Sequence, residues 1–215
     1  MTLVRPVEPT DISLSPPPPE DMAGLLVDLS DESPPVRRRA AHNLARTGEP
    51  QAIAALCARA GVETDETVLE TILTMVMGCR GRATVEGLLP YLASDNPSLR
   101  NGVADVLRAM PEAIGPHVEE VLSDHDPAVR IMGIGLLAGL PDPRVSGWLV
   151  EVIGRDDDFN VCAAAVDVLA EVGEPAALPA LKRLPTRFPG VPFLEFAIHT
   201  AVSRIGNGEG KRGAP

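Results

Sequence analysis

The chain has 215 residues, a formal net charge of −11 at neutral pH and an aromatic content of only 3%. The negative charge argues against a nucleic-acid-binding protein, because phosphates would be repelled unless positive charge were concentrated on one surface. Charged residues interrupt the apolar stretches before any is long enough to cross a bilayer, and the first residues lack a secretory signal pattern, so we expect a cytoplasmic protein with no membrane contact.

Residues 1–20 differ in composition from the rest of the chain. They carry Pro6, Pro9 and the run Pro16-Pro17-Pro18-Pro19. Proline has no amide donor and a restricted φ, so such a run favours an extended polyproline II conformation. We expect a disordered proline-rich leader. The alternative is a peptide that docks on a partner or on the rest of the chain.

From residue 21 to residue 206 one unit recurs six times, at a spacing of 30 to 33 residues. Each unit has an aliphatic anchor, and the anchors are Val36, Val68, Leu99, Val129, Val161 and Leu194. Three residues before five of them stands a Ser, Asp or Asn, which can accept hydrogen bonds from the free amides of a starting helix. Proline, which suits the first helical position, follows in four units. These second helices are therefore predicted to start near residues 34, 66, 97, 127, 159 and 192.

Another apolar helix precedes each anchored helix, so each unit is predicted to be a helical hairpin. Apolar residues recur four and eight positions after most anchors, which keeps one face of the second helix buried. No single hairpin can bury both of its faces, so the units must stack. The expected fold is an all-α, right-handed solenoid (an α-α superhelix) of six hairpins. The glycine-rich residues 207–215 are expected to be a flexible tail.

Two kinds of sequence stretch resemble a known family. Asp126-Pro127-Ala128-Val129-Arg130 resembles the D-P-x-V-R start of the second helix in HEAT repeats. Residues 48–56 and 173–181 resemble the G-(D/E)-P-x-A-x-x-A-L linker of the short HEAT-like repeats that also occur in phycobilisome lyases. The resemblance covers residues 21–206 and implies the solenoid fold. It says little about function, because function depends on sites that vary within a fold.

No motif in the sequence indicates catalysis, a cofactor or a metal. None of the four histidines has a second histidine at a spacing of three or four, so no local two-histidine metal site is present. The three cysteines Cys57, Cys79 and Cys162 form no CxxC pair and are interpreted as core residues of a reduced protein. We therefore expect a non-catalytic protein without a cofactor.

Three glycines occur within one predicted helix, at Gly133, Gly135 and Gly139. They do not form a phosphate-binding loop. Each costs a helix about 1 kcal/mol relative to alanine, so they are interpreted as marking either close packing or a soft point in the stack.

Arginine occurs at the start of several second helices. Arg37, Arg100 and Arg130 each follow their anchor directly. They could pair with acidic residues or carbonyls of a neighbouring repeat, or they could form a ladder that meets an acidic partner. Arg38 and Arg39 have no counterpart in the other units, so they are candidates for binding an acidic peptide or phosphate.

A second candidate surface lies in the last three units. Two residues after their anchors stand Ile131, Ala163 and Phe196, where the first three units have polar residues. If the second helices line the concave side of the solenoid, these three residues form an apolar strip that docks a partner helix or strand. The other interpretation is a capping repeat that buries the aromatic rings of the last unit under the chain end.

The function predicted from these features is a scaffold or adaptor that presents a preformed concave surface to a protein partner. Residues predicted to contact the partner are Arg37, Arg38, Arg39, Arg100, Arg130, Ile131, Ala163 and Phe196. The alternative is a subunit of an enzyme like the bilin lyases, which the family resemblance permits. A HEAT-like DNA glycosylase is a third possibility, which the acidic charge disfavours.

Overall fold

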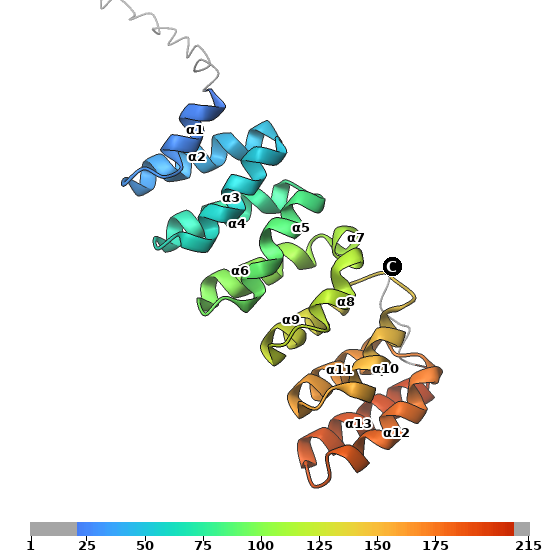
Figure 1. Cartoon of the computed structure of the whole chain (residues 1–215). Coiled ribbons are helices and arrows are strands. Elements are labelled where there is room, and N and C mark those ends of the chain that lie inside the picture. Colours follow the sequence, from blue (N-terminus) through green and yellow to red (C-terminus); the bar gives the residue numbers. More distant parts are fainter. Residues whose placement is uncertain (1–20, 209–215) are drawn as a thin grey trace, which may run out of the picture.

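The structure is a computed structural model that describes residues 21–208, and in that range it contains α-helices and short 3-10 helices but no strand. Within the same range the helices form six hairpins stacked along one axis (Figure 1). The prediction of an all-α solenoid is confirmed. The predicted leader 1–20 and residues 209–215 of the predicted tail lie outside the described residues.

Each hairpin consists of a first helical segment followed by a second helix. The first three hairpins are α1 (Met22–Asp28) with α2 (Pro34–Thr47), α3 (Pro50–Val62) with α4 (Glu66–Gly78), and α5 (Arg82–Leu88) and η1 (Leu89–Ala93) with α6 (Pro97–Arg108). The fourth is α7 (Pro111–Ile114), η2 (Gly115–His117) and α8 (Val118–Val121) with α9 (Pro127–Leu137). The last two are α10 (Val145–Arg155) with α11 (Phe159–Val172), and η3 (Pro175–Ala177) and α12 (Leu178–Arg187) with α13 (Pro192–Gly206).

Side-chain caps explain where most of the second helices begin. The side chains of Asp65, Asn96, Asp126 and Asp158 each accept hydrogen bonds from amides two or three residues later. These bonds satisfy donors that have no partner inside the helix. At α2, where the residue before the helix makes no side-chain cap, Pro34 and Pro35 occupy the first two positions and remove two of those donors instead.

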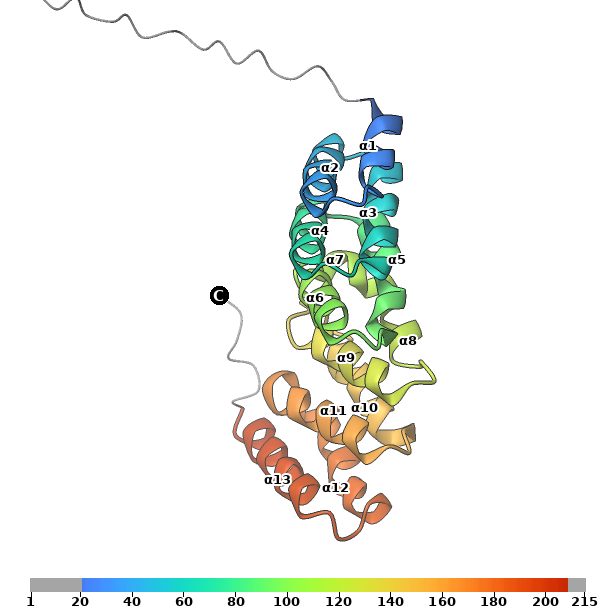
Figure 2. The same ribbon diagram turned by 90° about the vertical axis from the view of Figure 1, so that its left-hand side faces the viewer.

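The second helices form one side of the stack and the first helices form the other (Figure 2). Each second helix packs on its own first helix and on the second helices before and after it. The anchor Val36 is half-buried, whereas the other five anchors are buried. Burial of one such side chain contributes about 1.5–3 kcal/mol, so the repeated anchors build a core that extends along the whole stack.

The core divides into two clusters that meet in the fourth hairpin. One cluster extends from Leu25 to Leu136 and the other from Val118 to Ile205. Helices α8 and α9 each contribute to both clusters, and the first-helix side is broken there into the short segments α7, η2 and α8. The fourth hairpin therefore joins the two halves of the stack through both its first-helix side and its second helix.

Polar residues replace apolar ones on the outward face of the last described hairpin. Cys162 and Val166 of α11 are buried in the stack, and the equivalent residues of α13 are the exposed Glu195 and His199. Solenoids remain soluble when their terminal repeats have such polar faces. No helix among residues 21–208 has the length and apolar composition needed to span a membrane.

Candidate interaction surface

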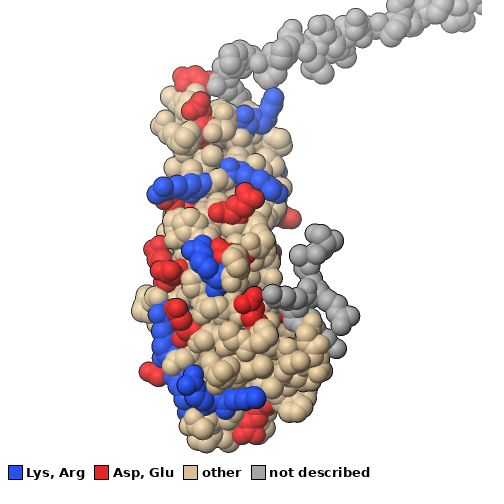
Figure 3. Space-filling model, turned by 90° about the vertical axis from the view of Figure 1, so that its right-hand side faces the viewer, with Lys and Arg blue, Asp and Glu red and all other residues tan. Residues whose placement is uncertain are grey.

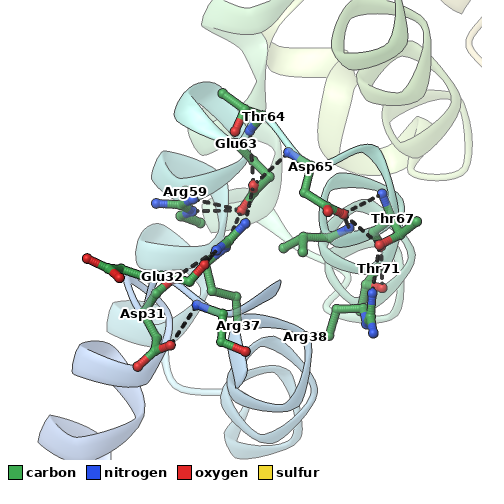
Figure 4. A network of polar contacts seen from close by, with 12 residues as sticks. Asp31, Glu32, Arg37, Arg38, Arg59, Glu63, Thr64, Asp65, Thr67 and Thr71 are labelled. Atoms are coloured by element: carbon green, nitrogen blue, oxygen red, sulfur yellow. Dashed lines mark hydrogen bonds and ion pairs between the residues drawn. The ribbon is translucent and has the colours of Figure 1, made fainter. Parts of the chain in front are cut away.

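The Arg37 side chain lies in the junction between the first and second hairpins (Figure 4). Its Nε and Nη2 donate to the two carboxylate oxygens of Glu63 at 2.9 and 2.8 Å. Its Nη1 donates to the carbonyl oxygens of Asp31 and Glu32 at 2.9 and 3.0 Å. Arg37 is only 6% exposed. This two-point pairing ties α2 to the residue that ends the next first helix.

Glu63 receives hydrogen bonds from several directions at once. Besides Arg37, the Arg59 side chain donates to its Oε2 at 2.9 and 2.8 Å, and the amides of Thr64 and Asp65 donate to its Oε1 at 3.0 and 2.9 Å. Burial raises the pKa of Glu63, but the bonds from Arg37, the Asp65 amide and Arg59 outweigh burial and lower this pKa to about 2. The carboxylate is therefore charged and fully paired at neutral pH.

The same arrangement recurs between the fourth and fifth hairpins. Arg130 donates through Nε and Nη2 to the carboxylate of Asp156 at 2.7 and 2.9 Å, and through Nη1 to the carbonyl oxygens of Asp124 and His125 at 2.8 and 3.2 Å. Burial raises the pKa of Asp156, but Arg130 and the Asp158 amide outweigh it and hold this pKa below its ordinary value. In both junctions the arginine reaches an acid 26 residues later in the chain.

The third and fifth repeats carry a reduced and a reversed form of this contact. Arg100 keeps one carbonyl contact, with Nη1 donating to Ser94 at 2.8 Å. In the fifth hairpin Cys162 takes the place of the arginine, and Arg187 of the sixth hairpin reaches back instead. Arg187 donates to the carbonyl oxygens of Ile153 and Asp156 at 2.6 and 2.8 Å. Asp156 is thus bound by the hairpin before it and by the hairpin after it.

These contacts change the interpretation of the arginines that follow the anchors. The side chains of Arg37 and Arg130 are 7% and 15% exposed, and a carboxylate neutralises each. Such groups offer almost no charge to a partner, so the predicted ladder is replaced at these two positions by pairing within the stack. Arg100 is half-buried and contributes at most part of its side chain to the surface.

Arg38 and Arg39 lie closer to solvent. Arg38 Nη1 donates to Thr67 Oγ1 on the next second helix at 2.7 Å. The side chain of Arg39 is 60% exposed, and its Nη2 lies 3.3 Å from Asp28 Oδ2. An exposed pair of this kind contributes about 0–1 kcal/mol, so these two arginines remain available as positive charge on the candidate surface.

The predicted apolar strip is interrupted. Phe196 is 72% exposed and Phe193 is 62% exposed, but Ile131 is half-buried and Ala163 is only 6% exposed. Ala163 therefore adds almost nothing to a docking surface. The polar outward face of α13 fits a capping repeat, yet the rings of Phe193 and Phe196 are not buried under it. Phe188 is half-buried, with its ring 5.3 Å from the Arg187 guanidinium.

A groove between α4 and α6 adds a feature that the sequence analysis missed. Its volume is about 330 Å³, and the apolar Leu69, Leu73 and Val106 lie beside the acidic Glu66, Glu70 and Asp105. The signal was present in the sequence as Gly102, which interrupts an otherwise regular second helix. A Cβ at that position would lie 2.5 Å from Leu73 Cδ1, so glycine lets the two helices approach.

A second depression, of about 520 Å³, lies between α7 and α10. Arg144 lines it and stacks on the Trp148 ring, with its guanidinium carbon 4.6 Å from the ring centroid. Arg144 also pairs with Asp142 at 2.7 Å, so its charge is partly balanced. In the part of the chain that the structure describes, no group of three or more His, Cys, Asp or Glu side chains could hold a metal ion.

Charge is distributed unevenly over the turns that join successive hairpins. Figure 3 shows that Lys and Arg alternate with Asp and Glu along much of this face, and that a stretch toward the C-terminal end of the stack carries little charge. Alternation of this kind gives no continuous basic track for a nucleic-acid backbone.

The stacked hairpins and their inter-repeat pairs define an α-solenoid repeat protein. The family model for HEAT repeats matches residues 115–187, and no curated protein matches the sequence. Among solved structures, the crystal structure of an engineered protein is 20% identical with a TM-score of 0.42, and the match covers 87% of this chain and 97% of that chain. The complex of CpcE and CpcF of phycocyanin lyase from Nostoc sp. PCC7120 is 17% identical with a TM-score of 0.38, and the match covers 94% and 100%. The family match assigns HEAT repeats to residues 115–187, and the other described hairpins have the same HEAT-like architecture.

Proposed function

We propose that this chain is a non-catalytic scaffold that binds a protein partner on its second-helix side. The observation that carries the proposal is the exposure of Phe193 and Phe196, at 62% and 72%, in a chain with few aromatic residues. A partner that covers such a ring gains about 1.5–3 kcal/mol from burial, and aromatic anchors of this kind dominate many interfaces.

The inter-repeat contacts support a preformed surface. The bonds of Arg37 to Glu63 and of Arg130 to Asp156 fix neighbouring hairpins relative to each other. A surface that is already ordered loses less conformational entropy on binding than a flexible one. We also propose a cytoplasmic location, which the free cysteines Cys57, Cys79 and Cys162 support.

The proposal is tested by affinity capture from the native cell lysate, with wild type compared with Phe193→Asp/Phe196→Asp. The matched control is Val27→Asp/Val62→Asp, because these residues are 72% and 68% exposed but lie on first helices. Circular dichroism establishes that each variant folds. We expect a stoichiometric protein that wild type and the control capture and the phenylalanine variant does not.

Two outcomes count against the proposal. Equal capture of the partner by all three proteins would show that the rings are not its binding site. Absence of any stoichiometric protein partner would remove the scaffold function itself.

A further inference from the structure

We propose that the groove between α4 and α6 binds a basic segment of a protein partner, in which lysines or arginines flank an apolar side chain. The inference rests on the proposed scaffold function and adds the chemistry of what is bound. The groove lies in the second and third hairpins, whereas Phe193 and Phe196 lie in the sixth. The two sites can therefore be tested separately.

The floor of the groove is apolar and set by packing. Leu69 and Leu73 of α4 are 3% and 8% exposed, and Val106 of α6 is fully buried. Met77 lies at one end and is 36% exposed. Gly102 allows the close approach of the two helices, because a Cβ there would lie 2.5 Å from Leu73 Cδ1. Such a floor can contact the methylene stem of a lysine or an aliphatic side chain.

The rim of the groove is acidic. Glu66 and Glu70 are exposed on the same face of α4, one helical turn apart, and within the described residues neither has an ion pair or a side-chain hydrogen bond. Asp105 faces them from α6 and pairs with Arg108 of its own helix at 2.5 Å. Like charges four residues apart repel each other in a helix, and a cation bound between them would relieve that repulsion.

The negative charge on the rim of the groove limits which ligands can bind there. An acidic peptide, a phosphate or a nucleic-acid backbone would be repelled by Glu66, Glu70 and Asp105. A segment with lysine or arginine would be attracted, and the attraction would fall as salt is added. The volume of about 330 Å³ lies at the small end of ligand pockets, so the groove fits one or two side chains of a short segment.

The experiment measures binding of the full chain to a fluorescent synthetic peptide in which two lysines flank a leucine, by fluorescence anisotropy at low and moderate salt. The same peptide with glutamates in place of the lysines is the probe control. We expect the lysine peptide to bind and the glutamate peptide not to bind. Glu66→Lys/Glu70→Lys should lower the affinity about tenfold or more.

Two further variants distinguish binding in the groove from general attraction to a negatively charged protein, and test whether the shape of the groove matters. Glu151→Lys/Glu171→Lys makes the same change in net charge at exposed positions of the fifth hairpin, away from the groove, and it should keep the wild-type affinity within about twofold. Thr74→Trp changes no charge but fills the groove that Thr74 lines, so it should also weaken binding. Phe193→Asp/Phe196→Asp should bind the peptide as wild type does.

The proposal is overturned if the lysine peptide does not bind. It is also overturned if the charge control loses affinity as the groove variant does, or if Thr74→Trp binds unchanged. If Phe193→Asp/Phe196→Asp failed to bind the peptide, the groove and the phenylalanines would not be separate binding sites. Failure of the capture experiment alone, with the peptide result intact, would remove the aromatic site and leave the groove.

Discussion

The guanidinium of Arg37 and the carboxylate of Glu63 form a two-point ion pair across the first junction of the solenoid, with N–O distances of 2.9 and 2.8 Å. The side chains are 7% and 0% exposed, so water cannot solvate either charge if its partner is removed. A buried pair of this kind adds modest stability while both partners are present, but removal of one partner is expensive.

Arg37→Met is therefore expected to lower the free energy of unfolding by about 3 kcal/mol, because it leaves the Glu63 carboxylate buried with Arg59 as its one remaining charged partner among the described residues. Urea denaturation followed by circular dichroism measures the change. Arg39→Met is the control, since the Arg39 side chain is 60% exposed and its loss should cost within about 0.5 kcal/mol. Equal effects of the two substitutions would contradict a structural role for Arg37.

The pKa of Glu63 predicts a dependence of stability on pH. This pKa is about 2 in the folded chain against an ordinary value of 4.5, so the folded state favours the charged form. The stabilisation is present above pH 4.5 and is lost as the pH falls from 4.5 towards 2. We expect Glu63→Gln to flatten the decline of the unfolding free energy in this window, measured by urea titrations at several pH values. Glu70→Gln, at an exposed position of α4, should leave the decline unchanged.

The glycines of α9 are predicted to respond in opposite directions to alanine. A Cβ at Gly133 would overlap with Val121 Cγ1, whereas a Cβ at Gly135 would meet nothing within 4 Å. Gly133→Ala should destabilise the chain by about 1–3 kcal/mol through overpacking. Gly135→Ala should stabilise it by about 0.5–1 kcal/mol, because alanine is the better helix former. Thermal unfolding of the two variants measures both changes in stability. A stabilising effect of Gly133→Ala would be incompatible with the close contact to Val121.

The buried cysteines should be slow to react with thiol reagents. Burial raises the pKa of Cys57 and of Cys162 to about 11, and Cys79 is half-buried with its pKa raised by the same cause. The thiolate is the reactive form, so we expect little labelling by Ellman's reagent in the native state at pH 8 and Cys79 to react first. All three should react in urea. Fast native labelling of Cys57 or Cys162 would show that the stack opens.

Local signals are sufficient to predict most of the fold. Asp65, Asn96, Asp126 and Asp158 are visible as helix caps because their acceptors lie only two or three residues from the amides they bind. The stacking then follows from the repeat itself, because each hairpin has an apolar face that only another hairpin can cover. The second helices accordingly start at the positions that these caps and prolines indicate.

The partners of the arginines are harder to predict, because they depend on contacts between units. Arg37 and Arg130 reach acids 26 residues later, but the residue 26 positions after Arg100 is Asp126, which caps α9 instead. In this shorter repeat the acid equivalent to Glu63 and Asp156 is Asp124, only 24 residues after Arg100, and among the described residues no ion pair joins the two. The interrupted apolar strip has a similar cause, since burial of Ala163 depends on how closely α13 packs on α11.

Between residues 21 and 208, the ion pairs that bridge hairpins hold the first junction and the fourth, and Arg187 adds hydrogen bonds and an ion pair to Asp157 at the fifth. The second and third junctions rely on apolar packing and on the carbonyl contact of Arg100 within its own hairpin. We therefore expect the solenoid to bend more easily at its second and third junctions than at its first, fourth and fifth. Bending at the second junction, where α4 and α6 meet, would change the width of the groove between them.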